Sequence, residues 1–188
     1  MVGIDYNEGP IAKVLEFDPS LPVSVGDVTQ IVFPDGYFDG YLSLGVIEHF
    51  AEGPQKALRE AHRVLKSGSV FIVVVPTRNI FMDLKAALTW FKKNSTLRQW
   101  LGKPPDTYYW EQYFKKKDLG DYLEAAGFEV RETHPLDHSH SLVSFANFFR
   151  DKQKYDEATP LAIRISEFLE KYFAWQTASQ MTLICYKK

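Results

Sequence analysis

Three positions in the first fifty residues combine a strand-like segment with side chains that could bind a ligand or move a proton. Asp5 ends a short apolar segment, Asp27 follows a second one, and the pair Glu48 and His49 follows a third. A carboxylate presents two acceptor oxygens to the hydroxyl or amine groups of a ligand. The imidazole of His49 titrates near neutral pH, so that it could position or deprotonate a hydroxyl. Each position also has a purely structural explanation. Asp5 could simply end a strand, Asp27 could be a turn residue, and His49 could cap the local backbone.

A histidine-rich stretch in the second half of the chain could also carry chemistry. His134, His138 and His140 lie close together in the sequence, with Asp137 between them. Zinc ligands usually sit on defined turns or on one helical face, whereas this stretch contains a proline and is expected to be a loop. We therefore expect no metal there, although one of the histidines could serve as a base at a substrate site.

The segments that would position these side chains alternate between strand and helix up to Pro76. Short apolar runs bounded by Gly, Pro and Asp predict strands, and apolar residues at helical spacing predict helices. The run 70–75 is apolar on both faces, which is typical of a parallel strand covered by helices on each side. The alternation predicts a parallel α/β sheet with right-handed crossovers. The predicted strands are 2–5, 23–25, 38–44 and 70–75, and the predicted helices are 11–15 and 54–65.

The pattern changes after Pro76. Residues 77–117 carry helical patterns, loop signals and many aromatic side chains but no convincing strand, which predicts a helical insert. Alternation then resumes, and we expect one domain over 1–188. Its parts are a core (1–76), the insert (77–117) and a C-terminal part with a second helical insert (118–188). The later predicted elements are helix 119–126, strand 128–133, helix 161–173 and strand 180–186.

Composition excludes several classes of protein. The 188 residues are 45% hydrophobic and carry a formal net charge of -2, which is ordinary for a globular domain and gives no basis for nucleic-acid binding. The longest apolar run, 70–75, is far too short to span a bilayer. The single Cys185 excludes an internal disulfide and suits the reducing cytoplasm, and its apolar neighbours predict a buried strand thiol.

Four pieces of the sequence together resemble the type 11 group of class I S-adenosylmethionine-dependent methyltransferases, which includes quinone-biosynthesis methyltransferases. Their order and spacing carry the resemblance, which covers 1–76 closely and 119–130 more loosely. It implies a Rossmann-like α/β sheet with helices on both faces and S-adenosyl-L-methionine as the cofactor. The four pieces are Val2-Gly3-Ile4-Asp5, Gly26-Asp27-Val28, the block 33–50 and Arg63-Val64-Leu65-Lys66-Ser67-Gly68.

The resemblance assigns the adenosine part of the cofactor to the first two pieces. It implies that Asp5 accepts hydrogen bonds from the ribose diol and that Tyr6 lies against the adenine ring. It also implies that Asp27, after Gly26, accepts from the exocyclic amine of adenine, while the backbone N–H of Val28 donates to a ring nitrogen.

The third piece would lie closer to the methyl group. Leu44 and Gly45 leave a strand at the carboxyl edge of the sheet, where open α/β sheets bind ligands, and Gly45 lets the backbone approach the cofactor. The resemblance places the next pair near the methyl-transfer path. His49 is the catalytic candidate, and Glu48 is expected to be structural.

The Gly-rich motif of the family does not occur in this sequence. In the family, a strand that ends in a pattern such as D-x-G-x-G-x-G is central in the order 3-2-1-4-5-7-6, and its glycines let the backbone pass beneath the cofactor. Without that strand, the strands 2–5 and 23–25 would be separated from 38–44 and 70–75. We hypothesise that the chain is a fragment, from a truncated gene or a misplaced start, and we expect weak or no cofactor binding. Its exposed sheet edges could promote self-association.

The aromatic insert suggests that the acceptor is a small apolar or aromatic molecule. Tyr108 and Tyr109 are the predicted acceptor contacts, although packing onto the sheet would explain most of the aromatic residues. The predicted function is transfer of the sulfonium methyl group to an oxygen, nitrogen or carbon atom, with the protein supplying proximity and orientation. Two alternatives are a non-catalytic methyltransferase-like binding module and a nicotinamide-dependent oxidoreductase. A nicotinamide-dependent oxidoreductase would also carry an acid at the end of a strand, but it would not account for the pieces that contain Gly26 and Glu48.

Overall fold

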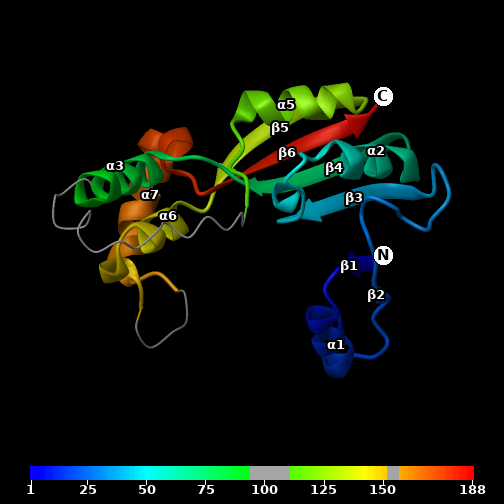
Figure 1. Cartoon of the computed structure of the whole chain (residues 1–188), viewed down its shortest axis with the longest axis horizontal. Helices are drawn as coiled ribbons and strands as arrows, with labels where there is room; N and C mark the ends of the chain where they lie inside the picture. The colour runs from blue at the N-terminus through cyan, green and yellow to red at the C-terminus, as the bar shows by residue number, and fades with distance from the viewer. Residues whose placement is uncertain (94–110, 152–156) are drawn as a thin grey trace.

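Strands and helices alternate through much of the chain in the computed structural model, which describes residues 1–93, 111–151 and 157–188 (Figure 1). The N-terminal elements are β1 (Gly3–Asp5), α1 (Glu8–Phe17) and β2 (Val23–Val25). Helix α1 begins where the side chain of Asn7 accepts a hydrogen bond from the backbone of Gly9 at 3.0 Å. Strands β1 and β2 pair in parallel and form a two-stranded sheet of their own.

A four-stranded sheet forms the centre of the molecule. Its strands are β3 (Phe38–Leu44), β4 (Leu65–Pro76), β5 (Phe128–Leu136) and β6 (Gln180–Lys187), in the order β3-β4-β6-β5. Strand β3 is parallel to β4, whereas β6 is antiparallel to both of its neighbours. No strand among the described residues joins β1 and β2 to β3, so the two sheets are separate, as expected from the sequence.

The alternation up to Pro76 predicts parallel pairing, which is confirmed for β3 with β4, but it carries no prediction for β6, which is antiparallel. This strand starts beside the ends of its neighbours, because Gln180 pairs with both Pro76 and Leu136. The helices between β5 and β6 stay at that end of the sheet, as Figure 1 shows, and do not return the chain to the opposite end. A strand that starts there must run backwards, and so it is antiparallel.

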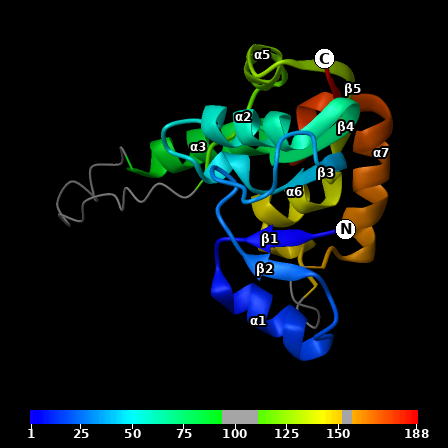
Figure 2. The same ribbon diagram turned by 90° about the vertical axis from the view of Figure 1, so that its right-hand side faces the viewer.

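Helices α2 (Gln55–Val64) and α5 (Lys116–Ala125) cover one face of this sheet. The core between them is apolar and includes Phe71 and Phe128, whose ring centroids are 4.7 Å apart. Figure 2 shows α2 and α5 on one side of the sheet and α6 on the other. The helix residues that enter this core are Ala57, Leu58, Ala61, Leu119 and Leu123.

The remaining helices gather at one end of the sheet (Figure 1). They are α3 (Ile80–Lys93), α6 (His138–Phe145), the short 3-10 helix η2 (Asn147–Phe149) and α7 (Pro160–Thr177). The expectation of a loop around His138 is wrong, because α6 begins there. Ser and His are weak helix formers, so the pattern was not distinctive, and the helix is fixed by its cap and by packing on α7.

Strand β4 begins at Leu65, earlier than the expected 70. Leu65 pairs with Phe38, and the register then shifts before Gly40 pairs with Val70. The residues expected to end the preceding helix therefore lie in an irregular first part of β4, where Gly68 has φ +74°.

The face of the sheet opposite α2 and α5 is only partly covered. Leu42 and Leu44 of β3 are 57% and 62% exposed, although both are large apolar side chains. None of the helices that the structure describes is long and apolar enough to cross a membrane.

Replacement of Phe71 by Ala is expected to lower the free energy of unfolding by about 3–5 kcal/mol. Phe71 is 1% exposed and packs between Tyr41 and Phe128, so the smaller side chain leaves a cavity in the core. Urea denaturation followed by circular dichroism measures the change. Leu42→Ala is the control, and its effect should stay within about 0.5 kcal/mol because this side chain is exposed.

Candidate functional site

The carboxyl ends of β3 and β4 meet at a glycine turn. Gly45 has φ +66°, a conformation that other residues adopt at a cost, and its N–H donates to the carbonyl oxygen of Val74 at 3.0 Å. The chain then enters the 3-10 helix η1 (Ile47–His49). The turn therefore places the side chains of η1 directly beyond the sheet edge.

Glu48 is the buried acid of this turn and is only 3% exposed. A Cβ atom built on Gly45 would lie 3.5 Å from Oε1 of Glu48, so the carboxyl group lies against the glycine backbone. Burial raises the pKa of Glu48 above its usual value, and the charge of Glu111 adds to the effect.

The segment 111–114 closes this region on one side. The N–H of Gln112 donates to the carbonyl oxygen of Glu48 at 2.9 Å, and the N–H of Phe114 donates to that of Pro76 at 3.1 Å. Thr77 adds a side-chain hydrogen bond to the carbonyl oxygen of Phe114 at 2.9 Å. These bonds fix the segment to both strand ends.

A carboxylate and a phenol of that segment, those of Glu111 and Tyr113, interact with each other. The hydroxyl of Tyr113 donates to the carboxylate of Glu111. Partial burial and this carboxylate raise the pKa of Tyr113 to about 12. Tyr113 therefore stays protonated at neutral pH.

Helices α3 and α6 form the opposite wall. Asn79, which is 4% exposed, donates through Nδ2 to Oγ of Ser141 at 3.1 Å and to the carbonyl oxygen of Ala178 at 2.9 Å. The rings of Phe81 and Phe145 lie 5.5 Å apart across the same two helices. The hydrogen bonds of Asn79 and the ring contact between Phe81 and Phe145 thus hold the wall together.

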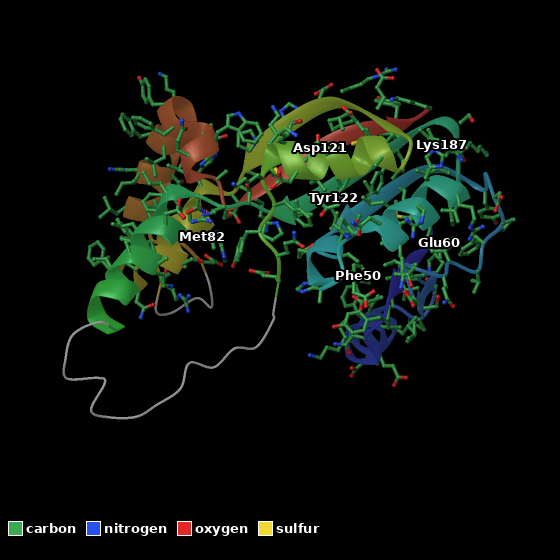
Figure 3. All side chains as sticks on the ribbon, turned by 45° about the horizontal axis from the view of Figure 1, so that its top comes forward. Phe50, Glu60, Met82, Asp121, Tyr122 and Lys187 are labelled. Atoms are coloured by element: carbon green, nitrogen blue, oxygen red, sulfur yellow. The ribbon has the colours of Figure 1, made fainter. Side chains whose placement is uncertain are left out.

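A cavity of about 770 Å³ lies between these walls. Glu48, Glu111 and Tyr113 line it from the sheet side, while α3 and α6 supply apolar and polar side chains such as Met82 and His140. Figure 3 labels Met82, which lines this cavity from α3. Its lining combines a small apolar group of side chains with a larger number of polar ones, and a cavity of this size can hold a small organic molecule.

The predicted adenosine contacts come together at the ends of β1 and β2. The N–H of Gly26 donates to the carbonyl oxygen of Asp5 at 2.9 Å, which joins the two strand ends. Each carboxylate also caps its own turn: Oδ1 of Asp5 accepts from the N–H of Asn7 at 2.8 Å, and Oδ1 of Asp27 accepts from that of Thr29 at 2.7 Å. Tyr6 is 80% exposed beside them.

The chain after Asp27 is anchored to the central core. Val28 packs against the main hydrophobic cluster. The N–H of Ile31 donates to Oε2 of Glu60 at 2.9 Å, and Arg63 donates to the carbonyl oxygen of Ile31 at 2.7 Å. This arrangement holds the end of β2 close to helix α2.

His49 does not line the large cavity. Its side chain is exposed and lines a second, smaller hollow of about 420 Å³ together with Thr29, Phe50 and Arg59. The hollow therefore joins η1 to the turn that follows Asp27. The catalytic role of His49 stays a prediction, but Glu48, expected to be structural, is the member of the pair that lines the large cavity.

The three histidines of the second half do not form a cluster. His134 is exposed on β5 and pairs with Glu132 at 2.9 Å, whereas His138 is buried against Thr177, also at 2.9 Å. Only His140 lines the large cavity. Over 1–93, 111–151 and 157–188, no three His, Cys, Asp or Glu side chains come together as a metal site would require.

Other sequence predictions have different outcomes. Cys185 is fully buried in β6, as predicted, and burial raises the pKa of its thiol to about 12. Tyr108 and Tyr109 lie outside the described residues. Asn79 and Glu111 were missed, because neither belongs to a recognisable motif. The only signal at Asn79 is its place just after a predicted strand.

A family model described as a methyltransferase domain matches residues 1–73. The ubiquinone/menaquinone biosynthesis C-methyltransferase UbiE of Caulobacter vibrioides is 30% identical over 135 residues, which are 67% of this chain and 53% of that protein. A 2-methyl-6-phytyl-1,4-hydroquinone methyltransferase of Arabidopsis thaliana is 34% identical over 80 residues, 42% of this chain and 23% of that protein. The chain spans about half the length of the first curated relatives that it matches.

Solved structures confirm the Rossmann-like α/β fold. An S-adenosylmethionine-dependent methyltransferase from Archaeoglobus fulgidus superposes with a TM-score of 0.59 at 18% identity, over 99% of this chain and 75% of that one. One from Methanosarcina mazei gives a TM-score of 0.59 at 15% identity, over 99% and 81%. At these identities the likeness concerns the fold.

The burial of Glu48 predicts a pH dependence of stability. Its pKa in the folded chain lies above the ordinary value of 4.5, so its contribution to the free energy of unfolding is complete below pH 4.5 and is lost as the pH rises through the folded pKa. In Glu48→Gln this loss disappears. The free energy of unfolding of the variant minus that of the wild type should therefore increase between pH 4 and pH 8.

Urea denaturation at several pH values measures this difference. Glu52→Gln is the matched control, because Glu52 lies on the same segment with its side chain 89% exposed. A difference that stays flat with pH for Glu48→Gln, as for the control, would show that Glu48 is not desolvated.

Proposed function

We propose that this chain, a member of the type 11 group of class I S-adenosylmethionine-dependent methyltransferases, transfers a methyl group to a small apolar or aromatic acceptor. The observation that carries the proposal is the cavity of about 770 Å³ beside the Gly45 turn. Ligands of open α/β sheets bind at the carboxyl ends of the strands, where this cavity lies.

The residues at the ends of β1 and β2 fit the adenosine part of S-adenosylmethionine. Two carboxylates, Asp5 and Asp27, stand at neighbouring strand ends, and their turn-capping bonds use only Oδ1 of each. The second oxygens would accept from ribose hydroxyls and from the adenine amine. In this proposal Gly26 and Val28 supply backbone contacts, and Tyr6 lies against the adenine ring.

The third strand end would face the methionine part. Here Leu44 and Gly45 bring the backbone close to the ligand. When bound, the cofactor supplies an activated methyl group on a sulfonium. The sequence offers no Gly-rich turn for the methionine part, so we expect the chain to bind the cofactor weakly.

The acceptor would lie in the large cavity. Its apolar wall, with Phe81, Met82 and Phe145, suits a ring, and its polar groups suit a ring substituent. Relatives named for ubiquinone, menaquinone and hydroquinone methylation support an aromatic acceptor of the hydroquinone type. The protein would contribute mainly by holding and orienting the acceptor next to the Gly45 turn. His49, in the neighbouring hollow, remains a candidate for moving a proton at the edge of the site.

A second candidate is a binding module that works through association. Strand β3 is an edge of its sheet, and Leu42 and Leu44 on it are more than half exposed. An exposed apolar edge strand is a template for pairing with a second copy of the chain.

The assignment of Asp5 and Asp27 predicts the effect of removing each carboxylate on ligand binding. We expect the chain to bind S-adenosylhomocysteine weakly, with at least about a tenfold loss in Asp5→Ala or Asp27→Ala, since each carboxylate would make a charge-assisted hydrogen bond. Ligand-observed NMR titration measures the affinity. Asp18→Ala is the control, because Asp18 also caps a local turn, at Ser20, away from these strand ends. Equal affinities for all three variants would overturn the assignment.

The association candidate predicts a concentration-dependent dimer. In Leu42→Glu/Leu44→Glu the dimer should weaken at least about tenfold, since charges on an edge strand oppose pairing. Sedimentation equilibrium gives the dissociation constants. Phe17→Glu is the control, because Phe17 is 90% exposed on α1, outside both sheets. A wild-type chain that stays monomeric at all concentrations rules the candidate out.

A further inference from the structure

We infer that Glu48 is the acceptor-binding residue of the large cavity, and that its carboxylate takes the proton of a hydroxyl group on the ring of the acceptor. The inference rests on the proposed function and deepens it, because it specifies a hydroxylated aromatic ring. It also transfers the proton-moving role from His49 to its neighbour in the sequence.

The position of Glu48 supports this role. Its carboxyl group lies against the Gly45 backbone at the strand ends and also lines the cavity, so it stands where the cofactor side and the acceptor side meet. Two backbone segments hold it there. The turn at Gly45 is tied to Val74, and Gln112 is bonded to the carbonyl oxygen of Glu48 itself. A side chain held in this way needs no rearrangement to meet a bound ring.

The other ionisable groups that line the cavity are Lys85, Glu111, Tyr113 and His140. Glu111 accepts a hydrogen bond from Tyr113, and Lys85 donates to the carbonyl oxygen of Ser144 at 2.8 Å on the far wall. His140 lies on α6, which is also on the far wall. Glu48, Glu111 and Tyr113 are thus the ionisable groups on the sheet side of the cavity, and of these Glu48 is the one whose carboxyl group lies against the Gly45 backbone.

The charges in the cavity select the kind of acceptor. Glu48 and Glu111 together disfavour a carboxylate or phosphate at this end, because like charges repel. A neutral hydroxyl can donate a hydrogen bond to the Glu48 carboxylate while its ring contacts Met82 and the aromatic side chains of the wall. The raised pKa of Glu48 brings it closer to that of a ring hydroxyl, which makes the proton transfer less unfavourable.

The proton step is simple to balance. The O–H bond of the acceptor breaks, its electron pair stays on the ring oxygen and spreads into the ring, and a new O–H bond forms on the Glu48 carboxylate. The ring becomes a stronger nucleophile at oxygen and at the conjugated ring carbons. Glu48 returns to the carboxylate form when it releases the proton to solvent.

Binding of two matched ligands tests the inference without the cofactor. The probes are 2-methyl-1,4-hydroquinone, kept reduced, and its dimethyl ether, which has the same ring but no hydroxyl donor. At pH 7.5 the wild-type chain should bind the hydroquinone at least about tenfold more tightly than the ether, as expected for a hydrogen bond to a charged group. In Glu48→Leu the preference should fall to about twofold or less. Isothermal titration calorimetry measures both affinities.

Two further variants complete the experiment. Glu48→Gln keeps the shape of the side chain and a neutral acceptor oxygen, so an intermediate preference is expected even if the leucine variant folds poorly. Glu52→Gln changes an exposed charge of the same segment and should keep the full preference.

The outcomes separate the inference from the proposed function. If the preference for the hydroquinone over the ether persists in both Glu48 variants, the inference is overturned but the proposed function is not. If the preference is lost in His49→Gln instead, the role belongs to His49. A wild-type chain that binds neither probe overturns the proposed acceptor class, and the inference with it.

Discussion

The structure depends on the pairing of β4 with β6 in the middle of the sheet. The ladder runs from Val70–Tyr186 to Pro76–Gln180, so the last strand of the chain lies beside the strand that ends at the cavity. One face of the pair carries the core under α2 and α5, and its end supports the wall helices through Asn79 and Ala178. The apolar core and the cavity are therefore held by the same two strands, because β6 starts at the carboxyl ends of β4 and β5, where the helical group lies.

The turn after β3 shows how the fold divides two neighbouring side chains. In η1, Glu48 turns inward and His49 turns outward, and each lines a different hollow. The inward carboxyl is costly, because an ionised group loses its hydration there. Functional sites often contain such locally unfavourable groups, and the surrounding structure must compensate for them. Here the Gly45 turn and the segment 111–114 do so by fixing the surroundings of Glu48.

Much of the fold could be predicted from the sequence, because most strands are short apolar runs between turn residues and the two helices over the core have clear apolar stripes. The start of α6 at His138 and the direction of β6 could not, since both depend on contacts between distant segments. At the site, the sequence identified the strand ends at Asp5, Asp27 and Gly45. It could not decide which of Glu48 and its neighbour faces the cavity, because in a 3-10 turn adjacent side chains diverge and the choice follows from packing.

The burial of Cys185 has a practical consequence. The thiol is inaccessible between β4 and β5, and its raised pKa keeps it protonated, while thiolate is the form that reacts with alkylating reagents. Because this is the single cysteine of the chain, its rate of alkylation is set by how often the middle of the sheet opens. The rate of Cys185 alkylation therefore reports how often the sheet opens, without any change to the sequence. A cysteine introduced on the surface could also carry a label without removal of Cys185.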